Sequence, residues 1–514
     1  MNAISQKVSS SLTQSVWSSE QIRAMEQGAV KDAGVMLFEL MSRAGQQVFH
    51  QACRQWPHAR YWWVVTGNGN NGGDGYIVAR LAQAAGIKVT VLPLVEPFYL
   101  RGDAATAYAY YQAEGGLVST LSRAQDSPDL IIDALLGTGC KGALGREAQR
   151  YIRFINSSTA PVLSIDMPSG VEADTGHIES DAVHADMTVC LVGLKLGLLT
   201  GRGPDVAGKI VVEDLEVSPL ANSTPWVSLL SWSYLYSLFP NRRVGAHKGE
   251  AGKLLIAGGQ PGMSGAIRLA GEAALRSGTG LVRLVSHEQH FSTLNLTRPE
   301  LMTATFSEFD EWSWAKAIVL GPGLGRSAWS HSLYQAALTV ARKNQTPLVL
   351  DADGLWWLSQ SQSVINTTTL PWVLTPHSGE AAHLLGCSIA EIEQDRRAAV
   401  LALQQRYGGV IVLKGAGTLI ADQDTVKLCQ YGNNGMASGG MGDVLSGIIG
   451  GFMAQGLTPM AAATLGVGLH SLAGDLAARQ GARGLVASDL LVPLKHLLNQ
   501  DDTYDPQYSH CSAS

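Results

Sequence analysis

A glycine-rich segment near the N-terminus has the composition of an anion-binding loop. Residues 64–82 read VVTGNGNNGGDGYIVARLA, in which Gly67, Gly69 and Gly72 match the G-x-G-x-x-G pattern of dinucleotide-binding turns. That pattern also needs an acid about 20 residues further on to bind the ribose, and the run IKVTVLPLV at 87–95 ends without one. The dense NNGGDG instead predicts a loop whose backbone N–H groups and asparagine side chains bind an anion.

Three aspartates accompany loops of this kind. Asp74 lies inside NNGGDG, Asp133 ends LIID before ALLGTGCKG, and Asp166 ends LSID before MPSGVEADTG. Carboxylates at the ends of adjacent strands are costly unless they are solvated, paired or bound to a cation. Beside anion-binding loops they predict acid/base chemistry on a phosphate-bearing substrate. The alternative for each is a structural role, as a first-turn helix acid or as the cap of a neighbouring loop.

The segment GMASGGMGDVLSG at 435–447 predicts a second reactive site. Asp443 follows the glycine run 439–442 and begins an apolar helix. The backbone amides of this run, aided by the positive end of the helix, would stabilise a transferring phosphoryl group. The carboxylate would accept a proton from a substrate hydroxyl. A glycine turn with a capping aspartate is the alternative.

Two further strand ends add candidate ligand-binding residues. Lys414 precedes the glycine turn GAGT, which predicts a phosphate or nucleotide clamp, and LTPHSGE places His377 and Glu380 beyond another strand. A solvated lysine and a structural histidine are the alternatives. The sequence contains no Walker A motif, no H-E-x-x-H and no G-x-S-x-G, which disfavours the enzyme classes that depend on them.

The elements that position these residues repeat one pattern in both halves of the chain. Short apolar runs such as LIIDALLGTG and PLVLDADGL end in glycine-rich or acidic turns and lead into helical stretches. This pattern predicts α/β folds with buried parallel strands, whose ligands bind beyond the C-terminal strand ends. Residues 218–225 are rich in Ser, Pro, Asn and Thr and read as a linker. We expect two domains, residues 11–218 and residues 226–505.

Composition limits the class of protein. Of the 514 residues, 46% are apolar and 16% are charged, which is ample material for two buried cores. The net charge of −6 argues against a nucleic-acid partner. Six cysteines without C-x-x-C spacing indicate neither a zinc site nor a disulfide framework. No apolar run approaches the roughly 20 residues that span a bilayer, and the N-terminus lacks a secretory signal. We expect a cytoplasmic homo-oligomer that acts on small molecules and has no membrane partner.

The first-half motifs carry a specific resemblance. GNGNNGGDG, DALLGTG and SIDMPSGVEADTG, in this order, resemble the YjeF N-terminal family, the NAD(P)H-hydrate epimerases, over roughly residues 15–215. The resemblance implies a Rossmann-like three-layer α/β/α domain in which Asp166 labilises C6 of the hydrated nicotinamide. It also implies a potassium ion beside Asn71, Asp133 and Ser169, and oxygen ligands suit that ion. The residues implied to bind the substrate are Asn70, Asn71, Gly72, Gly73, Asp74, Gly137, Thr138, Gly139, Cys140, Lys141, Gly142, Ala143 and Asp166.

The second-half motifs resemble another part of the same system. PGMSGA, GPGLG, DADGL, TPHSGE, KGAGT and MASGGMGDVLSG are similar to the ribokinase-like superfamily, and within it to the NAD(P)H-hydrate dehydratases, over about residues 240–500. Ser378 stands where that family usually has proline. The residues implied to line the hydrate site are Ala266, Gly323, His377 and Asp443. The residues implied to contact the adenine nucleotide are Lys414, Gly415, Ala416, Gly417, Thr418 and Gly442.

Together the two resemblances predict a bifunctional enzyme that repairs NADH and NADPH. The first domain would interconvert the R and S hydrates, and the second would dehydrate the S epimer. In that step Asp443 would deprotonate the hydroxyl for phosphorylation by ADP, accompanied by Mg²⁺. ADP is preferred to ATP because the fused architecture resembles bacterial members. The main alternative is a kinase of the hydroxymethylpyrimidine type whose first domain is a binding scaffold, as in mRNA decapping factors. A Rossmann dehydrogenase is disfavoured by the missing ribose acid.

Overall fold

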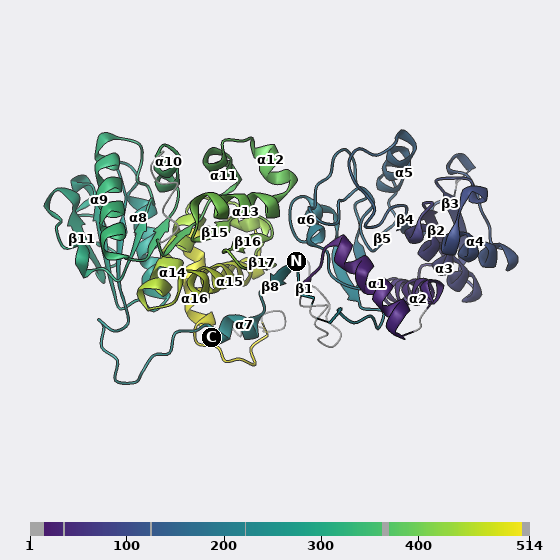
Figure 1. The fold of residues 1–514 in the computed structure, drawn as a ribbon, viewed down its shortest axis with the longest axis horizontal. Coiled ribbons are helices and arrows are strands. Elements are labelled where there is room, and N and C mark those ends of the chain that lie inside the picture. Colours follow the sequence, from purple (N-terminus) through teal and green to yellow (C-terminus); the bar gives the residue numbers. More distant parts are fainter. Residues whose placement is uncertain (1–14, 34–35, 124–125, 222, 362–369, 506–514) are drawn as a thin grey trace. The chain divides into compact units, whose positions relative to one another are not determined.

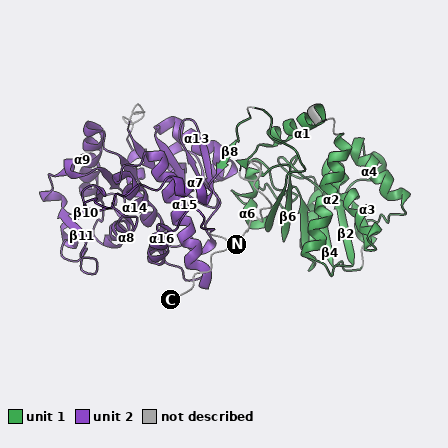
Figure 2. Ribbon diagram, turned by 90° about the horizontal axis from the view of Figure 1, so that it is seen from below, with its two compact units in different colours: residues 1–228 green, residues 229–514 purple. Residues whose placement is uncertain are grey.

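The structure is a computed structural model, and it describes residues 15–33, 36–123, 126–221, 223–361 and 370–505 (Figure 1). The chain divides into two compact units, Met1–Ser228 and Leu229–Ser514 (Figure 2). The division falls three residues after the end of the linker-like stretch 218–225. At this point β1 (Ser15–Val16) pairs antiparallel with β8 (Val227–Leu229).

The first unit is built on a parallel six-stranded sheet in the order β3-β2-β4-β5-β6-β7. Its strands are β2 (Tyr61–Thr66), β3 (Lys88–Pro93), β4 (Leu130–Ala134), β5 (Val162–Ile165), β6 (Met187–Leu191) and β7 (Lys209–Glu213). Its α-helices are α1 (Ser19–Ala33), α2 (Leu37–Gln55), α3 (Asn70–Ala84), α4 (Gly102–Ala113), α5 (Arg146–Asn156) and α6 (Gly203–Val206). Short 3-10 helices cover Pro97–Tyr99, Leu121–Arg123 and Leu196–Leu198.

Helices cover both faces of this sheet. Alternate residues of a strand point to opposite faces, and in β2 Trp62 and Val64 join an apolar core with α2, α3 and α4. Trp63 and Val65 join a second core on the other face, with α5. This confirms the three-layer α/β/α fold expected for the first half. Because β2, β4 and β5 are neighbouring parallel strands, the loops that follow them lie at one edge of the sheet.

The second unit contains a mostly parallel sheet, with the strand order β17-β16-β15-β14-β13-β12-β9-β10-β11. Only the β15–β16 and β16–β17 pairings in this order are antiparallel. The strands are β9 (Lys253–Ala257), β10 (Leu281–Ser286), β11 (Leu301–Thr305), β12 (Ala317–Leu320), β13 (Leu348–Leu350), β14 (Trp372–Leu374), β15 (Val410–Leu413), β16 (Thr418–Ala421) and β17 (Val426–Cys429).

The helices of this unit pack on both sides of its sheet (Figure 1). They are α7 (Trp232–Ser237), α8 (Ser264–Arg276), α9 (Ala328–Asn344), α10 (Asp353–Ser359), α11 (Ser378–Leu385), α12 (Ile389–Gln394), α13 (Arg396–Tyr407), α14 (Met441–Ala454), α15 (Pro459–Ala477) and α16 (Leu491–Leu497). Short 3-10 helices cover Glu288–His290, Phe306–Glu308, Trp312–Trp314, Asn434–Met436, Ala478–Gln480 and Ala487–Leu490.

Helix α14 is buried along almost its whole length, and its exceptions are informative. Among its residues only Gly442 and Asp443 are not fully buried. Gly447 lies so close to α8 that a Cβ added to it would be 2.1 Å from the carbonyl oxygen of Ala270. Glycine therefore allows the two helices to approach, and the packed helix holds Asp443 in a fixed place.

None of the helices in the described parts of the chain combines the length and apolarity needed to cross a membrane.

Candidate active sites

The first candidate site begins at the turn between β2 and α3. A Cβ on Gly67 would lie 1.9 Å from the carbonyl oxygen of Leu135, and one on Gly72 would lie 2.2 Å from that of Gly67. Glycines therefore let this turn close against the loop after β4. Asn70 and Asn71 open α3, Asn70 on the surface and Asn71 half-buried, with Asp74 buried behind them.

Asp133 connects the loops that follow β4 and β5. Its side chain is fully buried and accepts hydrogen bonds from the Ser164 hydroxyl (2.8 Å), the Ser169 hydroxyl (2.6 Å) and the Ser169 N–H (2.9 Å). The Leu136 N–H donates to the Ser169 oxygen at 2.9 Å. Burial raises the pKa of Asp133, and these hydrogen bonds limit the rise. Two of the three expected potassium ligands, Asp133 and Ser169, are thus in direct contact.

Asp166 is paired with a buried lysine that sequence reasoning missed. Lys195 Nζ donates to the Asp166 carboxylate and to the carbonyl oxygen of Leu191 (2.6 Å). The Leu191 N–H donates to Asp166 Oδ1 at 3.1 Å. Burial alone would lower the pKa of Lys195, but the neighbouring Asp166 carboxylate raises it. Asp166 has a φ of 66°, a left-handed conformation that is uncommon outside glycine and is often found at functional sites.

Two more acids share this environment. Burial, followed by the charges of Asp166 and Glu26, raises the pKa of Asp74 well above its usual range. Burial likewise raises the pKa of Glu26, which belongs to α1, against the opposing charge of Lys195. The raised pKa values favour the protonated form of Asp74 and Glu26, close to the ion-paired carboxylate of Asp166. Glu26 lies in no motif, whereas Lys195 had one signal, a cation inside the apolar run CLVGLKLGLL at 190–199.

The loop after β4 supplies the remaining residues expected at this site. It is half-buried at Gly137 and Thr138 and exposed at Gly139 and Lys141–Ala143, while Cys140 is buried. The Gly142 N–H donates to Glu172 Oε1 at 2.9 Å. A Cβ on Gly137 would be 3.3 Å from Asn71 Oδ1, so this loop lies against the start of α3. The residues expected from 70–74 and 137–143 therefore meet at one edge of the sheet.

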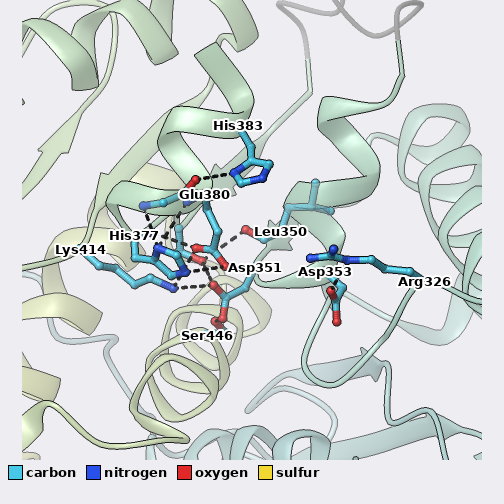
Figure 3. A network of polar contacts seen from close by, with 11 residues as sticks. Arg326, Leu350, Asp351, Asp353, His377, Glu380, His383, Lys414 and Ser446 are labelled. Carbon is cyan, nitrogen blue, oxygen red and sulfur yellow. Dashed lines mark hydrogen bonds and ion pairs between the residues drawn. The ribbon is translucent and has the colours of Figure 1, made fainter. Parts of the chain in front are cut away.

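The second candidate site is centred on Asp351, directly after β13. Its carboxylate accepts hydrogen bonds from Lys414 Nζ (2.8 Å), the Ser446 hydroxyl (2.6 Å) and the Thr375 hydroxyl (2.8 Å) (Figure 3). Burial alone would raise the pKa of Asp351, but the charge of Lys414 lowers it. Sequence reasoning noticed the surrounding DADGL motif without giving Asp351 a role. Through these hydrogen bonds the aspartate connects the C-terminal ends of β13, β14 and β15 with the buried helix α14.

Asp443 lies in the first turn of α14, near this cluster. Burial, followed by the charge of Asp351, raises the pKa of Asp443 to about 7, while Lys414 acts in the opposite direction. A Cβ on Gly442 would be 3.3 Å from Lys414 Nζ. Gly440, which precedes the helix, has a φ of 90°, a conformation that favours glycine. The Lys414 turn and the Asp443 turn therefore face each other, and a carboxyl group with a pKa near neutrality can exchange a proton there.

His377 and Glu380 connect this cluster to a cavity. The Glu380 carboxylate accepts the N–H of His377 at 2.8 Å and lies 3.6 Å from Lys414 Nζ. His377 Nδ1 accepts the N–H of Gly379 at 3.0 Å, so the imidazole caps α11. His377, Gly379 and Glu380 are among the residues that line a cavity of about 240 Å³. His377 thus has both a structural role and a position open to a ligand.

The other residues expected in the second unit fall into two groups. Gly323 has a φ of 58°, and its added Cβ would be 3.2 Å from Cβ of Ala266, so these two lie together. Lys414–Thr418 forms the turn between β15 and β16, exposed at Gly415 and Ala416. The Thr418 hydroxyl donates to the carbonyl oxygen of Gly415 at 2.9 Å and closes the turn.

Each of the two units matches the model of a known protein family. The family model for the YjeF-related protein N-terminus matches residues 37–197, and the model for NAD(P)H-hydrate dehydratase matches residues 254–495. A ribokinase-like superfamily protein from Enterococcus faecalis V583, of known structure, matches with a TM-score of 0.50 and 30% identity, covering 54% of this chain and 98% of that one. This confirms the ribokinase-like fold expected for the second half.

Curated relatives match over nearly the whole chain. The bifunctional NAD(P)H-hydrate repair enzyme Nnr of Escherichia coli (strain K12) is 44% identical over 501 residues, covering 96% of each chain. The enzyme of the same name from Vibrio cholerae serotype O1 is 43% identical over 491 residues, covering 94% of this chain and 98% of the relative. With both domains matched and in the same order, the chain belongs to the family of bifunctional NAD(P)H-hydrate repair enzymes.

Proposed function

We propose that this chain restores NADH and NADPH from their hydrates. The domain at 11–218 would interconvert the R and S epimers at C6, and the domain at 226–505 would dehydrate the S epimer at the expense of ADP. The observation that carries the proposal is that each unit has its own acid/base set at a sheet edge, centred on Asp166 in one and on Asp443 in the other. Near full-length relatives favour this function over a hydroxymethylpyrimidine-type kinase.

In the first site, Asp166 would act as the acid/base residue on the hydrated ring. The buried Lys195 forms an ion pair with the Asp166 carboxylate and would hold it in position beside the ring. Asp74 and Glu26, whose pKa values are raised by burial, would supply the complementary proton. The NNGGDG loop and the loop at 137–143 would bind the rest of the nucleotide through backbone N–H groups.

In the second site, Asp443 would take the proton of the C6 hydroxyl. The hydroxyl oxygen would then bond to the terminal phosphorus of ADP, and AMP would leave. Loss of this phosphate from C6, with a proton from C5, restores the double bond, so the sum is hydrate plus ADP giving the reduced coenzyme, AMP and phosphate. Lys414 and the 439–442 turn would hold the transferring phosphoryl group.

The expected metal ions fit the two sites differently. For potassium, the oxygens of Asp133 and Ser169 are buried and adjacent, and Asn71 Nδ2 is buried without a hydrogen-bond partner among the described residues. The opposite amide orientation would offer an oxygen instead, so the donor set fits a hard cation. For magnesium, no group of three or more His, Cys, Asp or Glu residues suited to a metal occurs in the described part of the chain. Mg²⁺ would therefore enter with the phosphates of ADP.

The full chain, incubated with purified S-hydrate, ADP and Mg²⁺, tests the dehydratase. We expect reduced-nicotinamide absorbance to return, with one AMP and one phosphate formed for each coenzyme restored. A stable phosphorylated product without a return of absorbance would instead support the kinase alternative. A cytoplasmic location, a homo-oligomer and ADP rather than ATP as phosphoryl donor stay predictions.

A further inference from the structure

The cavity beside the dehydratase site has further lining residues that the expected sites do not include. Besides His377 and Glu380, it is lined by Arg326, Asp353 and Trp356. Arg326 directly follows the turn GPGLG, three residues after Gly323. Figure 3 shows the Arg326–Asp353 pair as a group separate from the Asp351–Lys414–Ser446 cluster. A ligand in this cavity can therefore contact both Arg326 and Glu380, and Glu380 lies 3.6 Å from Lys414 Nζ of the reacting cluster.

Arg326 is held in position on two sides. Its Nε donates to Asp353 Oδ1 at 3.2 Å, and its guanidinium carbon lies 4.7 Å from the ring centroid of Trp356. Asp353 Oδ2 in turn accepts the N–H of Gly325 at 2.9 Å, which fixes the aspartate to the turn. An arginine stacked on an indole and anchored through Nε has lost much of its rotamer freedom before any ligand binds.

The Nη1 and Nη2 groups of Arg326 form the edge with which a guanidinium binds phosphate, and they are available to a ligand. Its Nη1 and Nη2 make no hydrogen bond to any described residue, and the side chain is 58% exposed. The two nearby carboxylates already accept other hydrogen bonds. Asp353 accepts those of the Gly325 N–H and Arg326 Nε, and Glu380 accepts that of the His377 N–H. A guanidinium presents two parallel N–H donors that match two oxygens of a phosphate.

We propose that Arg326, positioned by Trp356 and Asp353, binds a phosphate group of the hydrated coenzyme in the dehydratase site. The inference rests on the proposed function, because it takes the hydrate as the ligand of this cavity. The hydrate is favoured over ADP because one of the four residues expected at the hydrate site, His377, lines the cavity, whereas none of the six residues expected to contact the nucleotide does. Both the diphosphate bridge of either coenzyme and the additional 2′-phosphate of NADPH have the required chemistry.

The test compares Arg326→Gln with the wild-type full chain on the purified S-hydrates of NADH and NADPH. We expect the KM for hydrate to rise about tenfold, the effect of losing one charge-assisted hydrogen bond, with kcat nearly unchanged. A rise with the NADPH hydrate alone identifies the 2′-phosphate, and an equal rise with both hydrates identifies the diphosphate. Binding of NADPH and NADH by calorimetry should weaken in the same pattern. Arg326→Lys should recover part of the affinity.

Arg406→Gln is the matched control, because Arg406 also lies over an aromatic ring, that of Tyr407 at 5.5 Å, but does not line the cavity. Trp356→Leu should raise the same KM less than Arg326→Gln, and Trp356→Phe less still. Hydrate KM values equal to those of Arg406→Gln, a fall in kcat alone, or a rise only in the KM for ADP would overturn the proposal. A wild-type chain that restores no coenzyme would instead refute the proposed function.

Discussion

Lys195 donates a hydrogen bond to Asp166 from inside the first unit, with only 1% of the lysine side chain exposed. The two residues follow neighbouring parallel strands, Asp166 after β5 and Lys195 after β6. The sheet therefore sets the separation of the two charges, and the left-handed conformation of Asp166 orients its carboxylate. A buried ion pair of this kind is poor evidence for stability, but it fixes the position of the carboxylate that it holds.

Asp166→Asn should slow epimerisation strongly and spare dehydration. The amide keeps the shape of the side chain but cannot accept a proton, so conversion of the R-hydrate to the S-hydrate should slow by roughly 10² to 10⁴. The rate at which pure S-hydrate is converted to the reduced coenzyme with ADP should be unchanged, because Asp443 belongs to the other unit. Chiral chromatography of the hydrates measures the first rate, and reduced-nicotinamide absorbance measures the second. Epimerisation at the wild-type rate would contradict the role given to Asp166.

Lys195→Met should reduce the kcat of epimerisation more than it raises the KM. Methionine keeps the unbranched shape of lysine, one atom shorter, but removes the charge beside Asp166, and breaking a buried ion pair also costs about 3–5 kcal/mol of stability. Lys195→Arg should retain part of the rate. The control is Lys88→Met, which removes an exposed lysine paired with Asp126 at 3.2 Å and should change little. An equal loss in both variants would show that Lys195 has no specific role.

Dehydration should depend on pH through Asp443. Because the base is active only when deprotonated, kcat should fall as the pH drops through about 7, the pKa of this carboxyl group. The free energy of unfolding should depend on pH in the opposite direction. The pKa of Asp443 is about 7 in the folded state and 3.8 in the unfolded state, so between these values only the folded state binds the proton. The free energy of unfolding therefore decreases as the pH rises from 3.8 to about 7. Asp443→Asn should remove this contribution, which denaturant unfolding at several pH values would reveal.

Gly447→Ala should destabilise the second unit. Its Cβ would meet the carbonyl oxygen of Ala270 at 2.1 Å and separate α14 from α8, which corresponds to an overpacking cost of about 1–3 kcal/mol. Gly265→Ala, in α8 with nothing within 4 Å of the added Cβ, is the control and should be neutral or stabilising by up to about 1 kcal/mol. Equal midpoints for the two variants in denaturant would contradict the packing argument.

The sequence was sufficient for the architecture, whereas the roles given to the residues inside the dense motifs stay predictions. Buried parallel strands appear in the sequence as apolar runs, and Asp133, Asp166 and Lys414 lie at or just after the C-terminal ends of such strands, whereas Asp443 lies in the first turn of α14. The spacing of one motif cannot show which side chain from another segment will lie beside it. The fully buried environment of Asp133, held by hydroxyls from the β5 strand and loop, is therefore visible only in the folded chain.

The residues that sequence reasoning missed share a physical reason. Glu26 belongs to a helix outside every motif. Arg326 is positioned by its contact with Trp356, which lies 30 residues further along the chain. Lys195 was detectable only as a single cation in an apolar run, and such a lysine is more often directed to solvent. Asp351 lay within a recognised motif, but only the structure shows that Lys414, Ser446 and Thr375 all donate to it.

The most direct measurement gives the full chain a mixture of R- and S-NADPH hydrate with excess ADP, Mg²⁺ and K⁺ and follows the return of reduced-nicotinamide absorbance to completion. Conversion of both epimers to NADPH, with one AMP formed for each, is the predicted result. An absorbance that stops when only the S epimer has been consumed, or that never returns, would contradict the joint action of the Asp166 and Asp443 sites.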